Sequence, residues 1–171
     1  MDRETYEIKR SPGEAWIRIF RKGVRVIIIR AGTFVNMQKD VEECFGEQAR
    51  AMLYSAGVRA GKESARILLD EWEERGMDFL KRLSEFYCSE GVGWFKIKKI
   101  KIDPQKQSGC IQIEQSFIAE EYGPSDRPVC DFLSGYFAGI LEKIFGGQFS
   151  CNETKCVAKG DSCCEFMFEK S

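Results

Sequence analysis

One segment near the C-terminus limits the possible folds more than any other, because it predicts a helix with a very broad apolar surface. The segment PVCDFLSGYFAGILEKIFGG covers residues 128–147. Its apolar residues recur at three- and four-residue steps: Val129, Phe132, Leu133, Tyr136, Phe137, Ile140, Leu141, Ile144 and Phe145. Pro128 is expected in the first helical turn and Gly146 at the C-cap. Gly135 and Gly139 form a flat patch that another element can approach closely, so this helix must pack against other parts of the chain.

Strand patterns occur on both sides of a long helical region. Residues 15–20 and 24–30 predict a hairpin with Gly23 in its turn. From about Asn36 to residue 87 apolar residues follow helical spacing, and Gly46, Gly57 and Gly61 divide this region into two or three helices.

The second half of the chain returns to strand patterns. Residues 93–102 predict a strand with a β-bulge near Lys98 and Lys99, because the parity of its apolar residues changes there. Residues 110–122 predict a second strand, with Ile111, Ile113 and Phe117 on one side. After the apolar helix come a short strand, a loop and a closing strand at residues 163–170. The pattern predicts an α+β fold, an antiparallel sheet packed against a helical layer.

Length and charge exclude several classes of protein. The chain has 171 residues and is expected to form a single domain over residues 1–171. A formal net charge of -1 argues against direct nucleic-acid binding, which needs a basic excess. The charged N-terminus does not resemble a signal peptide, and no apolar run reaches the roughly 20 residues of a membrane span. We therefore expect a protein of the reducing cytoplasm, where structural disulfides are rare.

The stretch CNETKCVAKGDSCCEF, residues 151–166, contains four of the eight cysteines of the chain. A metal bound here must use cysteine, aspartate or glutamate, because the chain has no histidine. Glu153 and Cys156 lie three residues apart, and Cys164 follows eight residues later across a turn. These three residues can meet at one point, so the spacing favours a metal site, with redox chemistry or simple packing as alternatives.

The fourth ligand is expected from the start of the apolar helix. Cys130 lies there, where unpaired backbone amides favour a thiolate. Cys151 and Cys163 remain alternatives on spacing alone.

Four motifs resemble the 4-vinyl-reductase-like domain family: LYSAGVRAGKES, GVGWFKIKKI, EQSFIAEEYGPSDRPVCDFLSGYFAGILEKIFG and the cysteine stretch above. The resemblance covers about residues 49–168, so residues 1–35 form an N-terminal hairpin region and residues 36–171 the family core. The family is similar in fold to TRAPP-type tethering subunits. It includes the aromatic-sensing domains of phenol- and xylene-responsive activators.

The resemblance implies a structural zinc ion. Carried over residue by residue, the family's ligands are Cys130, Glu153, Cys156 and Cys164. Two departures limit the analogy: the phenol-sensing members use a pocket histidine that this chain lacks, and they carry ATPase and DNA-binding modules.

The resemblance favours a stand-alone sensor that binds a small apolar or aromatic ligand, such as a hydrocarbon, and signals through contacts with an unknown protein partner or as a homodimer. Candidate pocket residues are Trp94, Phe117, Phe132, Tyr136 and Phe137, although aromatic residues at helical spacing also suit a plain core. Three alternatives are an adaptor that pairs through its glycine-containing helices, a redox sensor using Cys163 and Cys164, and a reductase. We expect no enzyme, because the GVGW sequence is not a dinucleotide fingerprint and no catalytic triad is present.

Overall fold

The structure is a computed structural model that describes the chain except residues 1–8, 11, 14–16, 21–22 and 88–92. The helices are α1 (Ala31–Phe45), α2 (Gln48–Glu71), α3 (Gly76–Glu85), α4 (Phe117–Tyr122) and α5 (Asp131–Phe145), with a 3₁₀ turn η2 (Val157–Lys159). The strands are β1 (Lys9–Arg10), β2 (Ile17–Ile19), β3 (Val24–Val26), β4 (Lys96–Asp103), β5 (Ser108–Glu114), β6 (Phe149–Lys155) and β7 (Cys164–Lys170). The predicted α+β class is confirmed.

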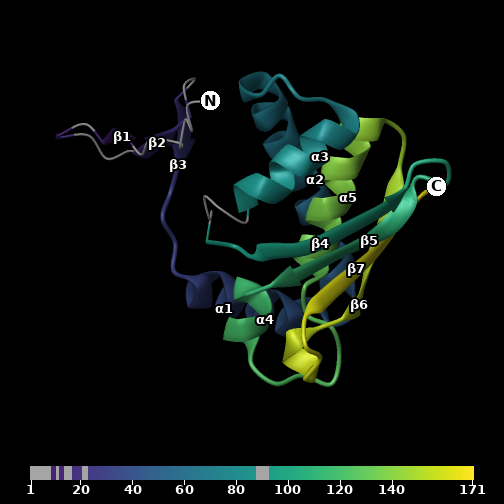
Figure 1. Ribbon diagram of the computed structural model, residues 1–171. Helices are drawn as coiled ribbons and strands as arrows, with labels where there is room; N and C mark the ends of the chain where they lie inside the picture. Colours follow the sequence, from purple (N-terminus) through teal and green to yellow (C-terminus); the bar gives the residue numbers. More distant parts are fainter. Residues whose placement is uncertain (1–8, 11, 14–16, 21–22, 88–92) are drawn as a thin grey trace.

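Four strands form the main sheet in the order β4-β5-β7-β6, and all neighbours are antiparallel. Apolar side chains of one face, such as Ile111, Ile113 and Phe166, are buried, while the residues between them face outward. The register of β4 against β5 shifts between Ile97 and Lys99, so the predicted β-bulge is confirmed. This sheet has one covered face, and α5 lies against that face (Figure 1).

Helix α5 is the centre of the molecule, because the sheet packs on one side of it and α2 on the other. Glycines make the contact between the two helices very close. A Cβ atom added to Gly61 would lie 2.0 Å from the carbonyl oxygen of Tyr136, and one added to Gly139 would lie 2.1 Å from that of Val58. The flat glycine patch predicted on α5 is therefore used inside the chain.

The expectation that Gly57 and Gly61 divide the helical region is wrong, since α2 continues through both. Both residues are buried against the backbone of α5. The packing gained by close approach outweighs the loss of roughly 1 kcal/mol per glycine in helix propensity. Gly46, in contrast, does end α1.

Two further predictions need correction. The strand predicted over residues 110–122 ends at Glu114, and Phe117–Tyr122 form α4. Ser116 caps this helix, because its hydroxyl accepts a hydrogen bond from the Ala119 amide at 3.4 Å. Helix α5 begins at Asp131, so Pro128 precedes the helix rather than occupying its first turn.

The predicted N-terminal hairpin is confirmed for β2 and β3, which pair from Ile17↔Val26 to Ile19↔Val24. Gly23 adopts a positive φ of 69° after two turn residues that lie outside the described part of the chain. The strand does not continue through residues 27–29 as predicted, because the pairing with β2 begins at Val26. This small sheet lies apart from the main one at the left of Figure 1. No helix in the described ranges is long and apolar enough to cross a bilayer.

Candidate metal centre and apolar cavity

The four residues expected to bind a metal come together at one end of α5. One donor atom each from Cys130, Glu153, Cys156 and Cys164 lies within 4.8 Å of the others. Cys130 precedes α5, Glu153 lies in β6, Cys156 lies between β6 and η2, and Cys164 begins β7. The cluster therefore joins the central helix to the last two strands, and it can hold a metal ion.

The start of α5 orients Cys130. Its carbonyl oxygen accepts the first helical hydrogen bond from the Ser134 amide at 2.9 Å. Its own amide donates to Oε2 of Glu153 at 2.8 Å. Cys130 thus lies at the N-cap, one position earlier than expected, and is completely buried.

The loop between Cys156 and Cys164 folds tightly around a single carbonyl group. The amides of Lys159 and Asp161 both donate to the Cys156 oxygen, at 2.9 and 3.2 Å. The Cys156 amide donates to the Asp161 carboxylate at 2.9 Å, and Gly160 supplies the left-handed conformation that the turn needs. The Val157 amide points at the sulfur of Cys164 at 3.4 Å. These contacts hold both sulfur atoms on the inner side of the loop.

Protonation of the cluster indicates what it needs. Hydrogen bonds from the Cys130 and Cys164 thiols lower the pKa of Cys156 to about 2. The pKa of Cys130 is raised well above its usual value by its thiol neighbours and by burial, and the pKa of Cys164 is raised as well. Burial and the nearby Cys156 raise the pKa of Glu153 to about 8. The cluster by itself therefore stabilises one negative charge, and further thiolates require a cation.

A second observation fits a bound cation. Oε1 of Glu153 is buried and has no hydrogen-bond partner among the described residues. An unpaired buried carboxylate oxygen is costly, and a metal ion would satisfy it. Three sulfur atoms and one oxygen also make the donor set of a closed four-coordinate site.

Outer residues tie this centre to α1. Gln38, which is 1% exposed, donates to the Val129 carbonyl at 2.8 Å, directly before Cys130. Gln38 also donates to Glu42 at 2.9 Å, and Glu42 accepts from Tyr122 at 2.6 Å and from Arg127 at 3.1 Å. Sequence patterns gave no signal for this network, because its members come from three separate segments.

The two alternative ligands take no part in the cluster. Cys151 is buried in β6, and its amide donates to the Tyr54 hydroxyl at 3.2 Å. Cys163 is buried next to Cys164 without belonging to the four-residue group.

The candidate pocket residues divide into two groups. Trp94 and Tyr136 line a cavity of about 500 Å³. Phe117, Phe132 and Phe137 do not line this cavity. Phe117 and Phe132 pack against Trp94, each at 6.0 Å between ring centroids.

Phe137 is a core residue in the arrangement that the structure describes. Its ring lies 5.3 Å from that of Phe95 and 5.0 Å from that of Phe166. It therefore faces the sheet, away from the cavity.

Most of the cavity wall comes from segments that the sequence did not connect. The hairpin supplies one side, α2 and the end of α3 another, and Tyr136 of α5 the floor. The lining residues are Ile19, Phe20, Val24, Arg25, Val26, Ile27, Ser64, Ile67, Leu68, Phe86, Tyr87, Trp94 and Tyr136. No local motif marks such a set, since its members are spread over more than 100 positions.

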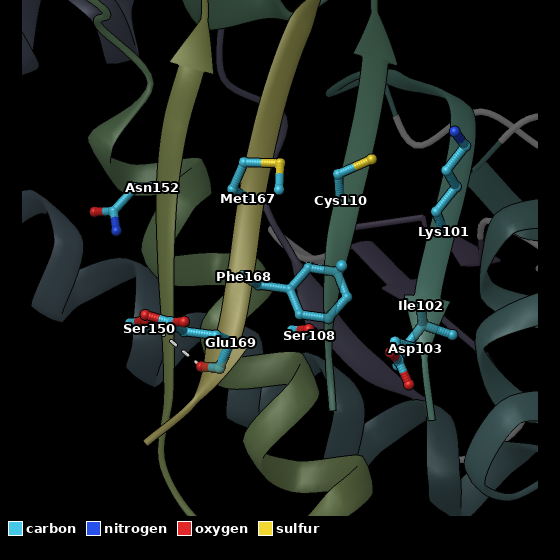
Figure 2. Close-up of a pocket in the computed structure, with 11 residues that line it drawn as sticks. Lys101, Ile102, Asp103, Ser108, Cys110, Ser150, Asn152, Met167, Phe168 and Glu169 are labelled. Atoms are coloured by element: carbon cyan, nitrogen blue, oxygen red, sulfur yellow. Dashed lines mark hydrogen bonds between the residues drawn. The ribbon is translucent and has the colours of Figure 1, made fainter. Parts of the chain in front are cut away.

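A second, open hollow of about 610 Å³ lies along the main sheet. Figure 2 shows Cys110, Met167 and Asn152 side by side on β5, β7 and β6, with Lys101 on β4. It holds a mixture of polar and apolar side chains and none of the predicted site residues.

Comparison with known proteins agrees with the resemblance seen in the motifs. Residues 110–170 match the family model of the 4-vinyl-reductase-like domain. An uncharacterized protein of Methanocaldococcus jannaschii is 28% identical over 118 residues, which cover 68% of this chain and 62% of that protein. The phenol regulator MopR of Acinetobacter guillouiae is 41% identical over 56 residues, 30% of this chain and 10% of that protein. The chain thus spans about three fifths of the first relative and far less of the second.

Solved structures show the same fold. The phenol-responsive sensory domain of the transcription activator PoxR, solved with phenol, superposes with a TM-score of 0.76 at 19% identity, covering 95% of this chain and 84% of that one. A trafficking protein particle complex subunit 3 from Naegleria fowleri, covalently bound to palmitic acid, gives 0.61 at 11% identity, covering 82% and 95%. Residues 110–170, which contain every residue of the four-membered cluster, belong to the 4-vinyl-reductase-like domain family.

Proposed function

We propose that this chain is a small-molecule-binding regulatory domain in which a zinc ion fixes one end of the central helix and an apolar ligand binds near the other. The observation that carries the proposal is the position of both features on α5. Cys130 belongs to the metal cluster, and Tyr136, six residues later and about 9 Å along the axis, lines the cavity. A ligand that moves Tyr136 would act on a helix whose beginning is held in place.

Zinc would be held by Cys130, Glu153, Cys156 and Cys164. Its role would be structural, because four protein ligands leave no open position for a substrate. The zinc ion would stabilise the thiolates of the cluster and link α5 to the β6–β7 hairpin.

The names of similar proteins support a ligand-binding role. PoxR was solved with phenol, and MopR is named a phenol regulator. This chain has no histidine, and its cavity of about 500 Å³ is lined mainly by apolar and aromatic side chains. Such a lining suits an apolar or aromatic ligand.

Native mass spectrometry of the purified protein tests this proposal in one measurement. We expect one zinc ion per chain and a population with a bound small molecule that is released under denaturing conditions. Protein that carries no metal and, when offered a series of hydrocarbons, binds none would contradict it.

Signalling requires a second protein surface, for which a homodimer is the simplest proposal. Ile27, Ile28 and Ile29 are 77%, 72% and 46% exposed between β3 and α1, and Ile27 also lines the cavity. Contiguous exposed apolar residues favour association. Sedimentation velocity should show a dimer that Ile28→Asp dissociates, while the adjacent Arg30→Ala leaves it intact.

An adaptor role remains the alternative, supported by the likeness to a trafficking-complex subunit. The glycine faces suggested for partner binding are occupied by the α2–α5 contact, so an adaptor would need another surface. A reductase role is the third candidate, because one solved relative is titled a vinyl-4-reductase family protein. Thermal protection by NADPH would favour the reductase.

A further inference from the structure

Two tyrosine hydroxyl groups meet at the wall of the apolar cavity. The hydroxyl oxygens of Tyr87 and Tyr136 lie 2.6 Å apart. Both side chains line the cavity and are almost fully buried, at 5% and 2% exposed. Ser64, on α2, lines the same cavity and hydrogen-bonds to Tyr136.

This group has more hydroxyl hydrogens than it can use. Two tyrosines supply two hydrogens for the single bond between them, so one is left over. When Ser64 donates to Tyr136, one tyrosine hydrogen is again left over, whichever tyrosine donates to the other. A buried donor without an acceptor is costly, more so than an acceptor with a free lone pair. The tyrosine pair therefore presents a hydrogen-bond donor at the cavity wall.

The remaining wall supplies little competition for this donor. Arg25 is the one charged side chain among the described lining residues, and it lies on the exposed face of β3. Burial raises the pKa of both tyrosines, so both hydroxyls stay protonated at neutral pH. The site is therefore an apolar space in which the tyrosine pair offers a neutral donor.

We propose that the ligand is a neutral, mostly apolar molecule with one acceptor oxygen, such as a ketone, ether or alcohol, which binds the Tyr87–Tyr136 pair. This inference rests on the proposed ligand cavity and narrows its chemistry. A pure hydrocarbon leaves the donor unpaired, and a carboxylate would have to give up its hydration next to neutral hydroxyls. A carbonyl oxygen satisfies the donor and leaves the rest of the ligand in apolar contact.

Matched probes test the pair. We suggest 4-phenylbutan-2-one and butylbenzene, which share a skeleton and differ by a carbonyl in place of a methylene group. The variant to compare is Tyr87→Phe/Tyr136→Phe, because it removes both hydroxyls of the pair together and leaves neither tyrosine with an unpaired partner, so folding should be kept. We expect the double variant to lower ketone affinity about tenfold, as one buried hydrogen bond predicts, and to change butylbenzene affinity less than about twofold.

Single variants and a control sharpen the result. Either single Tyr→Phe change keeps one hydroxyl hydrogen, so each should lower ketone affinity less than the double change. Tyr122→Phe removes a hydroxyl that bonds to Glu42 near the metal cluster and should change neither affinity.

Each remaining outcome contradicts a different proposal. Equal losses for ketone and butylbenzene in the double variant would overturn the polar anchor and leave the apolar cavity standing. Failure of the wild-type protein to bind either probe would overturn the cavity and the anchor together.

Discussion

The two ends of α5 are built in opposite ways. Around Cys130 the side chains are fully buried, and backbone amides surround the cluster at short range. Around Tyr136 a cavity remains between the helix and the N-terminal hairpin. A closed end and an open end on the same helix suit a protein that must be rigid at one site and adaptable at the other.

The difference also lies in the distance along the chain. Three members of the cluster fall within 12 residues, from Glu153 to Cys164, and the tight loop brings them together. The cavity instead joins Ile19 to Tyr136 across the whole fold. Local geometry builds the first site, and tertiary packing builds the second.

The largest effect is expected at the closed end. Cys156→Ser removes a proposed zinc ligand and leaves a buried hydroxyl among thiolates, so we expect loss of the metal and a fall of more than about 3 kcal/mol in unfolding free energy. Urea unfolding and elemental analysis measure both quantities. Cys163→Ser, one residue before Cys164, should keep full metal content. A Cys156→Ser protein with unchanged stability would remove the contrast between the two ends.

A smaller but substantial effect is expected in the shaft that joins them. Gly61→Ala places a Cβ 2.0 Å from the Tyr136 carbonyl oxygen, so the helices must separate, at a cost of about 3 kcal/mol. The matched control is Gly32→Ala in α1, whose new Cβ would meet only the flexible end of Glu121 at 3.2 Å. Its stability should stay constant or rise slightly by helix propensity. Thermal unfolding of both variants gives the comparison, and equal melting temperatures would argue against the close helix contact.

How much of this could be predicted depends on which physical effect decides each element. The E-x-x-C-x₇-C spacing predicted that Glu153, Cys156 and Cys164 can meet, because a short loop has few ways to close. Cys130 followed from the helix start. The metal itself is not settled by this, since spacing describes positions and not occupancy.

Other elements could not be predicted because one residue type serves two purposes. Gly61 read as a helix interruption, but its small size is what the α2–α5 contact requires. Phe117 read as the end of a strand, but the cap from Ser116 begins a helix there. The cavity left no pattern at all, since Tyr87 and Ser64 are ordinary residues until folding brings them together.

The connection from α1 to the metal cluster predicts a medium effect. Gln38→Leu removes the hydrogen bond to the Val129 carbonyl, which fixes the peptide before Cys130. We expect metal affinity to fall roughly 10- to 100-fold, as is typical for groups that orient metal ligands, with a loss of about 1–3 kcal/mol in stability. Competition with a chromophoric chelator measures the affinity. Met37→Leu, an exposed neighbour on the same helix, should change neither value, and unaltered affinity in Gln38→Leu would confine the closed end to its four ligands.

The smallest change in stability is expected at the open end. Phe20 lines the cavity from the hairpin, and its ring lies 6.3 Å from that of Phe86. Because Phe20 is only half-buried, Phe20→Ala should lower unfolding free energy by less than about 1 kcal/mol. It should nevertheless weaken butylbenzene binding several-fold, since ligand contact area is lost. A variant that is strongly destabilised but binds normally would reverse the assignment, making the hairpin part of the rigid end and leaving the protein without an adaptable one.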